Sequence, residues 1–223
     1  MADKKLPSNI NINFNPKIDS EANLKNTVFE SYQKNKSFFG KDSQKIIIDF
    51  IYKRSQMDKI CNYKTEDWLV GYANKNHIFI FSPTVFSKIS NHPQSDFSYV
   101  LTHEIAHIFT HDILDFYYPK WLHEGIAGYV AKQYKIRSVK KIEDFSKLHN
   151  KDSWGKFVNY PQAFSFTKYL VDKFGKKKIL NFLENLRKEN GCYSSYEEFV
   201  NYFNKFLKSD FLKLTLNWQK NFN

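Results

Sequence analysis

The residues in this sequence with the clearest chemical capacity are His103, Glu104 and His107, which form a His-Glu-x-x-His pattern. The pattern falls within YVLTHEIAHIFTH, residues 99–111, whose apolar positions are typical of a helix. A four-residue step along a helix returns nearly to the same face, so both imidazoles can reach one cation. Glu104 then lies beside a metal-activated water without being a ligand, which suits a general base in hydrolysis. The pattern therefore predicts one Zn²⁺ per chain.

The helix that carries this pattern is apolar on most of its sides. Apolar residues occupy several faces, at Val100, Leu101, Ile105, Ala106, Ile108 and Phe109. Such a helix is expected to be buried, and buried imidazole and carboxylate groups need partners. A bound metal supplies a partner for all three polar side chains. We therefore interpret the pattern as a metal site rather than as two surface histidines on an ordinary amphipathic helix.

A catalytic zinc site needs a third protein ligand, and the sequence offers four candidates for it. His111 continues the four-residue series, but it lies about 12 Å along the helix axis from His103, which is too far for one ion. Asp115 follows in the turn after the helix. His123 and Glu124 lie on the next helical segment, in WLHEGIAGYV.

The two motifs together resemble the gluzincin metallopeptidases, most closely the small bacterial proteins described as peptidase MA-like. In aminopeptidases of that clan, the His-Glu-x-x-His helix is followed by Trp-Leu-Asn-Glu-Gly-Phe-Ala, whose Glu is the third zinc ligand. Glu124 in WLHEGIAGY matches that position. The resemblance, which covers about residues 99–175, thus implies His103, His107 and Glu124 as zinc ligands and Glu104 as the general base.

The same resemblance extends to the segment YPQAFSFTKYLVDKFG, which begins at Tyr160. In the resembling peptidases, a Tyr at this helix start donates a hydrogen bond to the oxyanion opposite the metal. The resemblance therefore implies this role for Tyr160. From its position alone, Tyr160 would simply pack at the entrance of a helix. Other tyrosines available for the role are Tyr129, Tyr134 and Tyr169.

Three features depart from the pattern of that clan. Sixteen residues, 108–123, separate His107 from Glu124, against eighteen in the aminopeptidases, so the connecting loop is tighter. His123 replaces the Asn before the ligand, and Gly128 cannot supply the carboxylate that thermolysin-like relatives place four residues after their Glu. The Gly-Ala-Met-Glu-Asn motif that holds a free substrate amine is absent, because the comparable hairpin is GYANKN. The departures favour an endopeptidase over an exopeptidase.

The elements that must position these residues divide into an α+β part and a helical part. Strands are predicted at residues 10–14, 45–52, 67–73 and 77–82, the last two as a hairpin. Helices are predicted before the metal helix at 19–39 and 56–61, and after it at 119–134, 141–148, 161–174, 176–188, 195–207 and from 209 onward. We expect an α+β, zincin-like fold with an N-terminal twisted sheet and an active-site helix, followed by an all-helical half.

We divide the chain into an N-terminal arm at residues 1–20, an α+β subdomain at 21–115 with the zinc helix, and a helical subdomain at 116–223 with the third ligand and Tyr160. No apolar stretch approaches about 18 residues, so no transmembrane helix is expected. The start MADKKLPSNI lacks the apolar core of a signal peptide. We expect a cytoplasmic protein as the chain stands, or a secreted or envelope-associated one where an export signal precedes it.

The chain carries a formal net charge of +11, which raises the question of an anionic partner. Only three of its 34 basic residues are Arg, namely Arg54, Arg137 and Arg187. Specific nucleic-acid recognition favours the planar fork of Arg, whereas scattered Lys is typical of a solvated surface. We therefore expect a peptide or protein substrate that adds to the sheet edge around residues 71–74, and no specific nucleic acid. The alternative is a non-catalytic, zinc-stabilised binding module with a basic surface for an anionic envelope polymer or nucleic acid.

Overall fold

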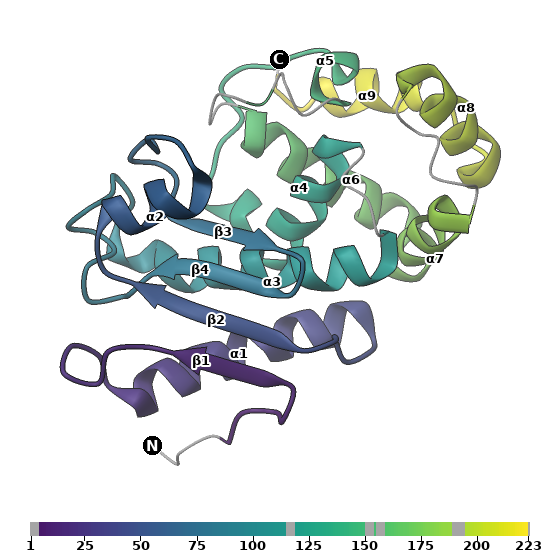
Figure 1. Ribbon diagram of the computed structural model, residues 1–223. Coiled ribbons are helices and arrows are strands. Elements are labelled where there is room, and N and C mark those ends of the chain that lie inside the picture. The colour runs from purple at the N-terminus through teal and green to yellow at the C-terminus, as the bar shows by residue number, and fades with distance from the viewer. Residues whose placement is uncertain (1–4, 115–118, 150–153, 155–158, 189–194, 223) are drawn as a thin grey trace. The chain divides into compact units, whose positions relative to one another are not determined.

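The computed structural model describes residues 5–114, 119–149, 154, 159–188 and 195–222. Strands and helices alternate at first (Figure 1), as β1 (Ile10–Asn13), α1 (Glu21–Phe39), β2 (Ile46–Ile51), α2 (Arg54–Cys61), β3 (Gly71–Asn74), β4 (His77–Phe81), the short 3₁₀-helix η1 (Gln94–Asp96) and α3 (Phe97–Leu114). The elements that follow are helical: α4 (Lys120–Val130), η2 (Gln133–Lys135), α5 (Phe145–His149), α6 (Tyr160–Phe174), α7 (Lys176–Lys188), α8 (Tyr196–Leu207) and α9 (Phe211–Gln219). The predicted α+β class is confirmed.

The chain forms two compact units, Met1–Phe109 and Thr110–Asn223, and the division falls within α3. The three-part division proposed from the sequence, with boundaries after residues 20 and 115, stays a prediction. Among the described helices, none combines the length and the apolar character that a membrane span requires.

The sheet of the first unit has the strand order β1-β2-β4-β3. β1 and β4 pair with β2 in parallel, and β3 pairs with β4 in the antiparallel direction. The predicted edge strand and hairpin are thus confirmed, and β3 forms the second edge. The left-handed residue of the hairpin turn is Lys75, with φ of 53°, and not one of its Asn neighbours.

β3 begins at Gly71, later than the predicted start at Asp67, because Arg54 uses the carbonyls of the preceding residues. Its guanidinium donates to the carbonyl oxygens of Leu69 at 2.5 Å, Glu66 at 3.1 Å, Asp67 at 3.3 Å and Ile89 at 2.6 Å. Carbonyls that accept from a cation are withdrawn from strand pairing. Burial lowers the pKa of Arg54. The segment before β3 is therefore a loop held by one half-buried cation.

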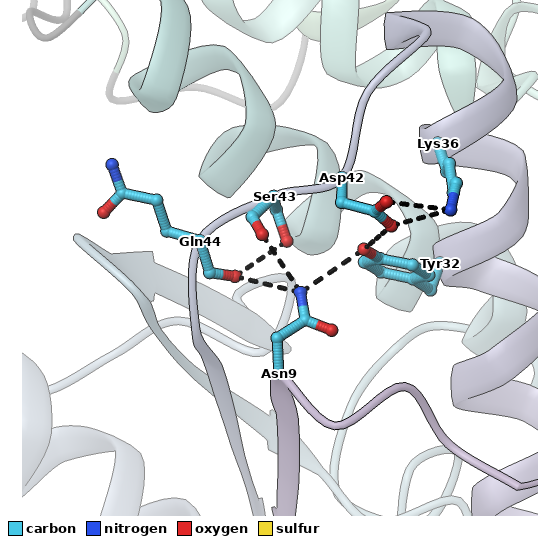
Figure 2. A network of polar contacts seen from close by, with 6 residues as sticks. All are labelled: Asn9, Tyr32, Lys36, Asp42, Ser43 and Gln44. Carbon is cyan, nitrogen blue, oxygen red and sulfur yellow. Dashed lines mark hydrogen bonds and ion pairs between the residues drawn. The ribbon is translucent and has the colours of Figure 1, made fainter.

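The N-terminal strand is tied to α1 and to the loop before β2 by a polar network (Figure 2). Its members are Asn9, Tyr32, Lys36, Asp42, Ser43 and Gln44. The Asn9 amide donates to the Tyr32 hydroxyl at 3.3 Å and to the carbonyls of Ser43 and Gln44 at 3.0 and 3.3 Å, and the Tyr32 hydroxyl donates to Asp42 at 2.7 Å. These contacts fix the parallel register of β1 and β2, which starts with Ile10 opposite Ile46.

The first part of α3 is anchored on α1 and on residues around the sheet. The Asn35 amide donates to the Thr102 carbonyl at 3.0 Å, and the Thr102 hydroxyl lies 3.1 Å from the Ser31 hydroxyl. The Phe97 ring packs against Phe86 with ring centroids 5.5 Å apart. The six apolar residues between Val100 and Phe109 are buried, which confirms that this helix belongs to the core. These contacts fix the orientation of α3, the helix that carries the His-Glu-x-x-His pattern, about its own axis.

In the second unit, α4 packs closely on α6 (Figure 1). Two glycines of α4 face that helix. A Cβ atom on Gly125 would overlap the Thr167 hydroxyl and lie 2.8 Å from the Ala163 carbonyl oxygen. A Cβ atom on Gly128 would overlap the Phe164 ring. The short approach of the two helices therefore requires glycine at both positions.

Gly128→Ala is expected to destabilise the protein by about 3 kcal/mol or more, because the new methyl group would overlap the Phe164 ring, which is buried. The free energy of unfolding from urea titration measures the effect. Gly40→Ala is the matched control, since it adds the same methyl group with no atom within 4 Å and costs only the strain of its φ of 73°, about 1–2 kcal/mol. A loss for Gly128→Ala no larger than for Gly40→Ala would contradict the packing argument.

Candidate metal centre

The two histidines of the pattern lie one turn apart on α3. Their ring centroids are 4.6 Å apart and the ring planes are nearly perpendicular, at 88°. His103 and Glu104 are buried, whereas His107 is half-buried. The helical spacing thus brings both imidazoles together, with Glu104 beside them.

Glu124 supplies the third potential ligand atom. One ring nitrogen from each of His103 and His107 and one carboxylate oxygen of Glu124 all lie within 4.8 Å of one another. Ligand atoms about 2.1 Å from a tetrahedral zinc are about 3.4 Å apart, so small side-chain rotations suffice to close the group around an ion. Two imidazoles and one carboxylate are also ligands that catalytic zinc takes, with a fourth position left open. The three residues fit one Zn²⁺, and no second group of this kind occurs within the described residues.

The other candidates for the third ligand are not part of this group. His111 lies on α3 and His123 on α4, and neither belongs to the set of ligand atoms within 4.8 Å. Asp115 lies outside the described residues. The geometry therefore favours Glu124 among the candidates that the structure describes.

Glu104 lies against the first residue of β3, a contact that the sequence did not indicate. A Cβ atom built on Gly71 would be 2.7 Å from Oε1 of Glu104, 2.8 Å from its Cγ and 2.9 Å from its Cδ. These separations are shorter than real Cβ contacts. The carboxylate thus lies directly beside the backbone of an edge strand.

A comparison with protein families shows to which family the chain belongs. Residues 25–217 match the family named BSP, described as peptidase of plants and bacteria. This chain belongs to that peptidase family. No curated protein and no solved structure matches it. A peptidase acts on peptides or proteins, which gives the substrate class.

In this peptidase, the carboxylate of Glu124 is buried and pairs with an ammonium group one turn earlier. Lys120 forms an ion pair with Glu124 Oε1, and its Nζ lies 5.8 Å from the centre of the Trp154 ring. A cation at this place compensates for the burial of the carboxylate and fixes its orientation. Lys120 was not among the residues predicted from the sequence, although its four-residue spacing from Glu124 was a visible signal.

Tyr160 of the peptidase opens α6 and is half-buried. Its ring packs on Trp154 with centroids 5.0 Å apart at 90°, and Trp154 is the ring on which Lys120 lies. Tyr160 therefore belongs to the same cluster of side chains as Glu124. Tyr129 stacks instead on Tyr134, with centroids 5.7 Å apart, and burial raises its pKa. Five residues after Glu124 on α4, Tyr129 points about 140° away around the helix axis.

Proposed function

We propose that this protein is a zinc-dependent endopeptidase of the gluzincin type, in which His103, His107 and Glu124 hold one Zn²⁺. The observation that carries the proposal is the group of three ligand atoms within 4.8 Å, with Glu104 next to His103 in a chain of a peptidase family. A carboxylate beside two zinc-binding imidazoles can act as the general base for a zinc-activated water in peptide hydrolysis.

The chemical roles follow from what each side chain can do. When bound, zinc supplies Lewis acidity, which polarises the scissile carbonyl and lowers the pKa of a water. Glu104 accepts the proton from the attacking water and donates it to the leaving amine. Tyr160 donates a hydrogen bond to the oxyanion. No side chain needs to form a covalent bond to the substrate.

The peptide groups of β3 support an extended substrate. The Val70 carbonyl accepts from the Phe81 amide at 3.1 Å, so alternate residues of β3 direct their peptide groups toward β4. The intervening residues, Gly71 and Ala73, then direct their peptide groups away from β4, toward the open edge of the sheet. An extended peptide that pairs there gains main-chain hydrogen bonds beside Glu104. Pairing of this kind uses the backbone and needs no chain terminus, which favours cleavage within a chain.

The test is hydrolysis of unfolded casein by the zinc-loaded protein, with the products identified by mass spectrometry. We expect internal cleavage products that disappear with a chelator, return with zinc, and are not formed by the Glu104→Gln variant prepared in the same way. The charge of +11 favours the alternative of a binding module for anionic polymers. Salt-sensitive binding of heparin by the zinc-loaded protein, without cleavage of casein, would support that alternative and overturn the proposal.

Tyr160→Phe is expected to lower turnover by about 10²–10³-fold, the usual effect of losing one oxyanion donor. Zinc content and the unfolding midpoint should stay near those of the wild type, because the ring that packs on Trp154 remains. Tyr129→Phe is the matched control and should keep turnover within about threefold. A loss of less than about threefold in Tyr160→Phe would place the donor elsewhere.

A further inference from the structure

We infer that Gly71 is a positioning residue for Glu104. Because Gly71, the first residue of β3, has no side chain, the Glu104 carboxylate can occupy the space beside it. The inference rests on the proposed function, because Gly71 acts only through Glu104. The zinc-binding pattern does not include this glycine.

The contact leaves no room for a side chain on Gly71. Three successive atoms of Glu104, namely Cγ, Cδ and Oε1, lie 2.7–2.9 Å from the position of a Cβ atom on Gly71. Real Cβ atoms essentially never approach a neighbour within 3.0 Å. Both residues are buried, so solvent does not provide an easy alternative position for the carboxylate. Any other residue at position 71 therefore requires a different conformation of Glu104.

When a methyl group is added at position 71, we expect the side chain of Glu104 to move and the strand to stay in place. Gly71 is paired with Ile80 across the ladder, and the neighbouring Val70 carbonyl accepts from the Phe81 amide. Glu104 is held by its helix backbone, but its carboxylate turns about three side-chain bonds. A methyl group at position 71 thus displaces the carboxylate while strand and helix stay in place. The effect falls on catalysis more than on folding.

The same glycine also sets the separation between the base and the strand edge. If the substrate pairs with the outward peptide groups of Gly71 and Ala73, its backbone lies on the far side of Gly71 from β4. A displaced carboxylate is then misaligned with the water that attacks the bound peptide. Misplacement of a reacting group by about 1 Å can cost about 10² in rate.

Gly71→Ala tests the inference through kinetics, zinc content and structure. We expect kcat to fall about 10²-fold, with KM within about threefold, unchanged zinc content and an unfolding midpoint near that of the wild type. A crystal structure of the variant should show the Glu104 carboxylate moved from its wild-type position. Gly40→Ala, which adds the same methyl group where no atom lies within 4 Å, should leave kcat near the wild-type value.

A double-mutant cycle separates this role from a general effect on the strand. Glu104→Ala removes the atoms that meet the new methyl group, so Gly71→Ala should change its residual turnover less than about twofold. Wild-type kcat in Gly71→Ala, or an unmoved Glu104 carboxylate, would overturn the inference. An equal loss of turnover with and without Glu104 would also overturn it. If the wild type itself does not cleave peptides, the proposed function fails, and the carboxylate position in Gly71→Ala still decides whether Gly71 places Glu104.

Discussion

Glu104→Gln is expected to retain one zinc per chain and the wild-type fold while turnover falls by about 10²–10⁴-fold. The amide of Gln fills the same buried volume as the carboxylate, but it does not accept a proton at neutral pH. The two proposed zinc ligands on the same helix, His103 and His107, are unchanged. Zinc content, the unfolding midpoint and the rate of peptide hydrolysis measure the three parts of this expectation.

The control for this variant is Glu66→Gln, the same chemical change at an exposed position. Glu66 accepts a hydrogen bond from the Trp68 indole, and the side-chain oxygen of Gln can do the same. Its turnover should therefore match that of the wild type. Wild-type turnover in Glu104→Gln would remove Glu104 from the mechanism.

Glu124→Ala is expected to weaken zinc binding by more than about 100-fold and to abolish hydrolysis at limiting zinc. A ligand contributes more than the outer groups that orient it, and loss of such outer groups already costs about 10–100-fold in metal affinity. Competition with a chelating dye measures the affinity. The variant also leaves the Lys120 ammonium without its carboxylate, so some loss of stability accompanies the loss of zinc.

Two further variants distinguish the loss of a zinc ligand from the loss of the ion pair between Lys120 and Glu124. Lys120→Met removes the ion pair and keeps all three ligands, so it should still bind one zinc. His111→Ala should bind zinc like the wild type, because His111 is not among the three clustered ligands. Full zinc content in Glu124→Ala, together with loss of zinc in His111→Ala or Asp115→Ala, would show that the third ligand is misassigned.

The local parts of this molecule were predictable because short-range rules determine them. The spacing of His103 and His107 predicted rings on one helical face, and their centroids lie 4.6 Å apart. The first helix was predicted to end at residue 39, and Gly40, the next residue, adopts φ of 73° as its left-handed cap. The predicted start of β3 at Asp67 was wrong, because Arg54, which is distant in sequence, withdraws the carbonyls of Asp67 and Leu69 from strand pairing.

The candidate centre was predictable only in part. Chemistry and helical spacing left Asp115, His123 and Glu124 as choices for the third ligand, and the resemblance to gluzincins selected Glu124, which the structure groups with the histidines. Lys120 was visible as a four-residue spacing, but nothing in the sequence marked it as the partner of a ligand. The approach of Gly71 to Glu104 depends on how the sheet packs on α3, which no local pattern encodes.

The zinc site is tested most directly by a titration of the metal-free protein with Zn²⁺ while peptide hydrolysis is recorded. We expect no turnover without metal, a linear rise of the rate with added zinc, and a break at one zinc per chain. The Glu104→Gln variant should bind the same single equivalent without turnover. Hydrolysis that persists in the fully metal-free protein, or that needs no residue of the His103, His107 and Glu124 group, would contradict a zinc peptidase built on these three ligands.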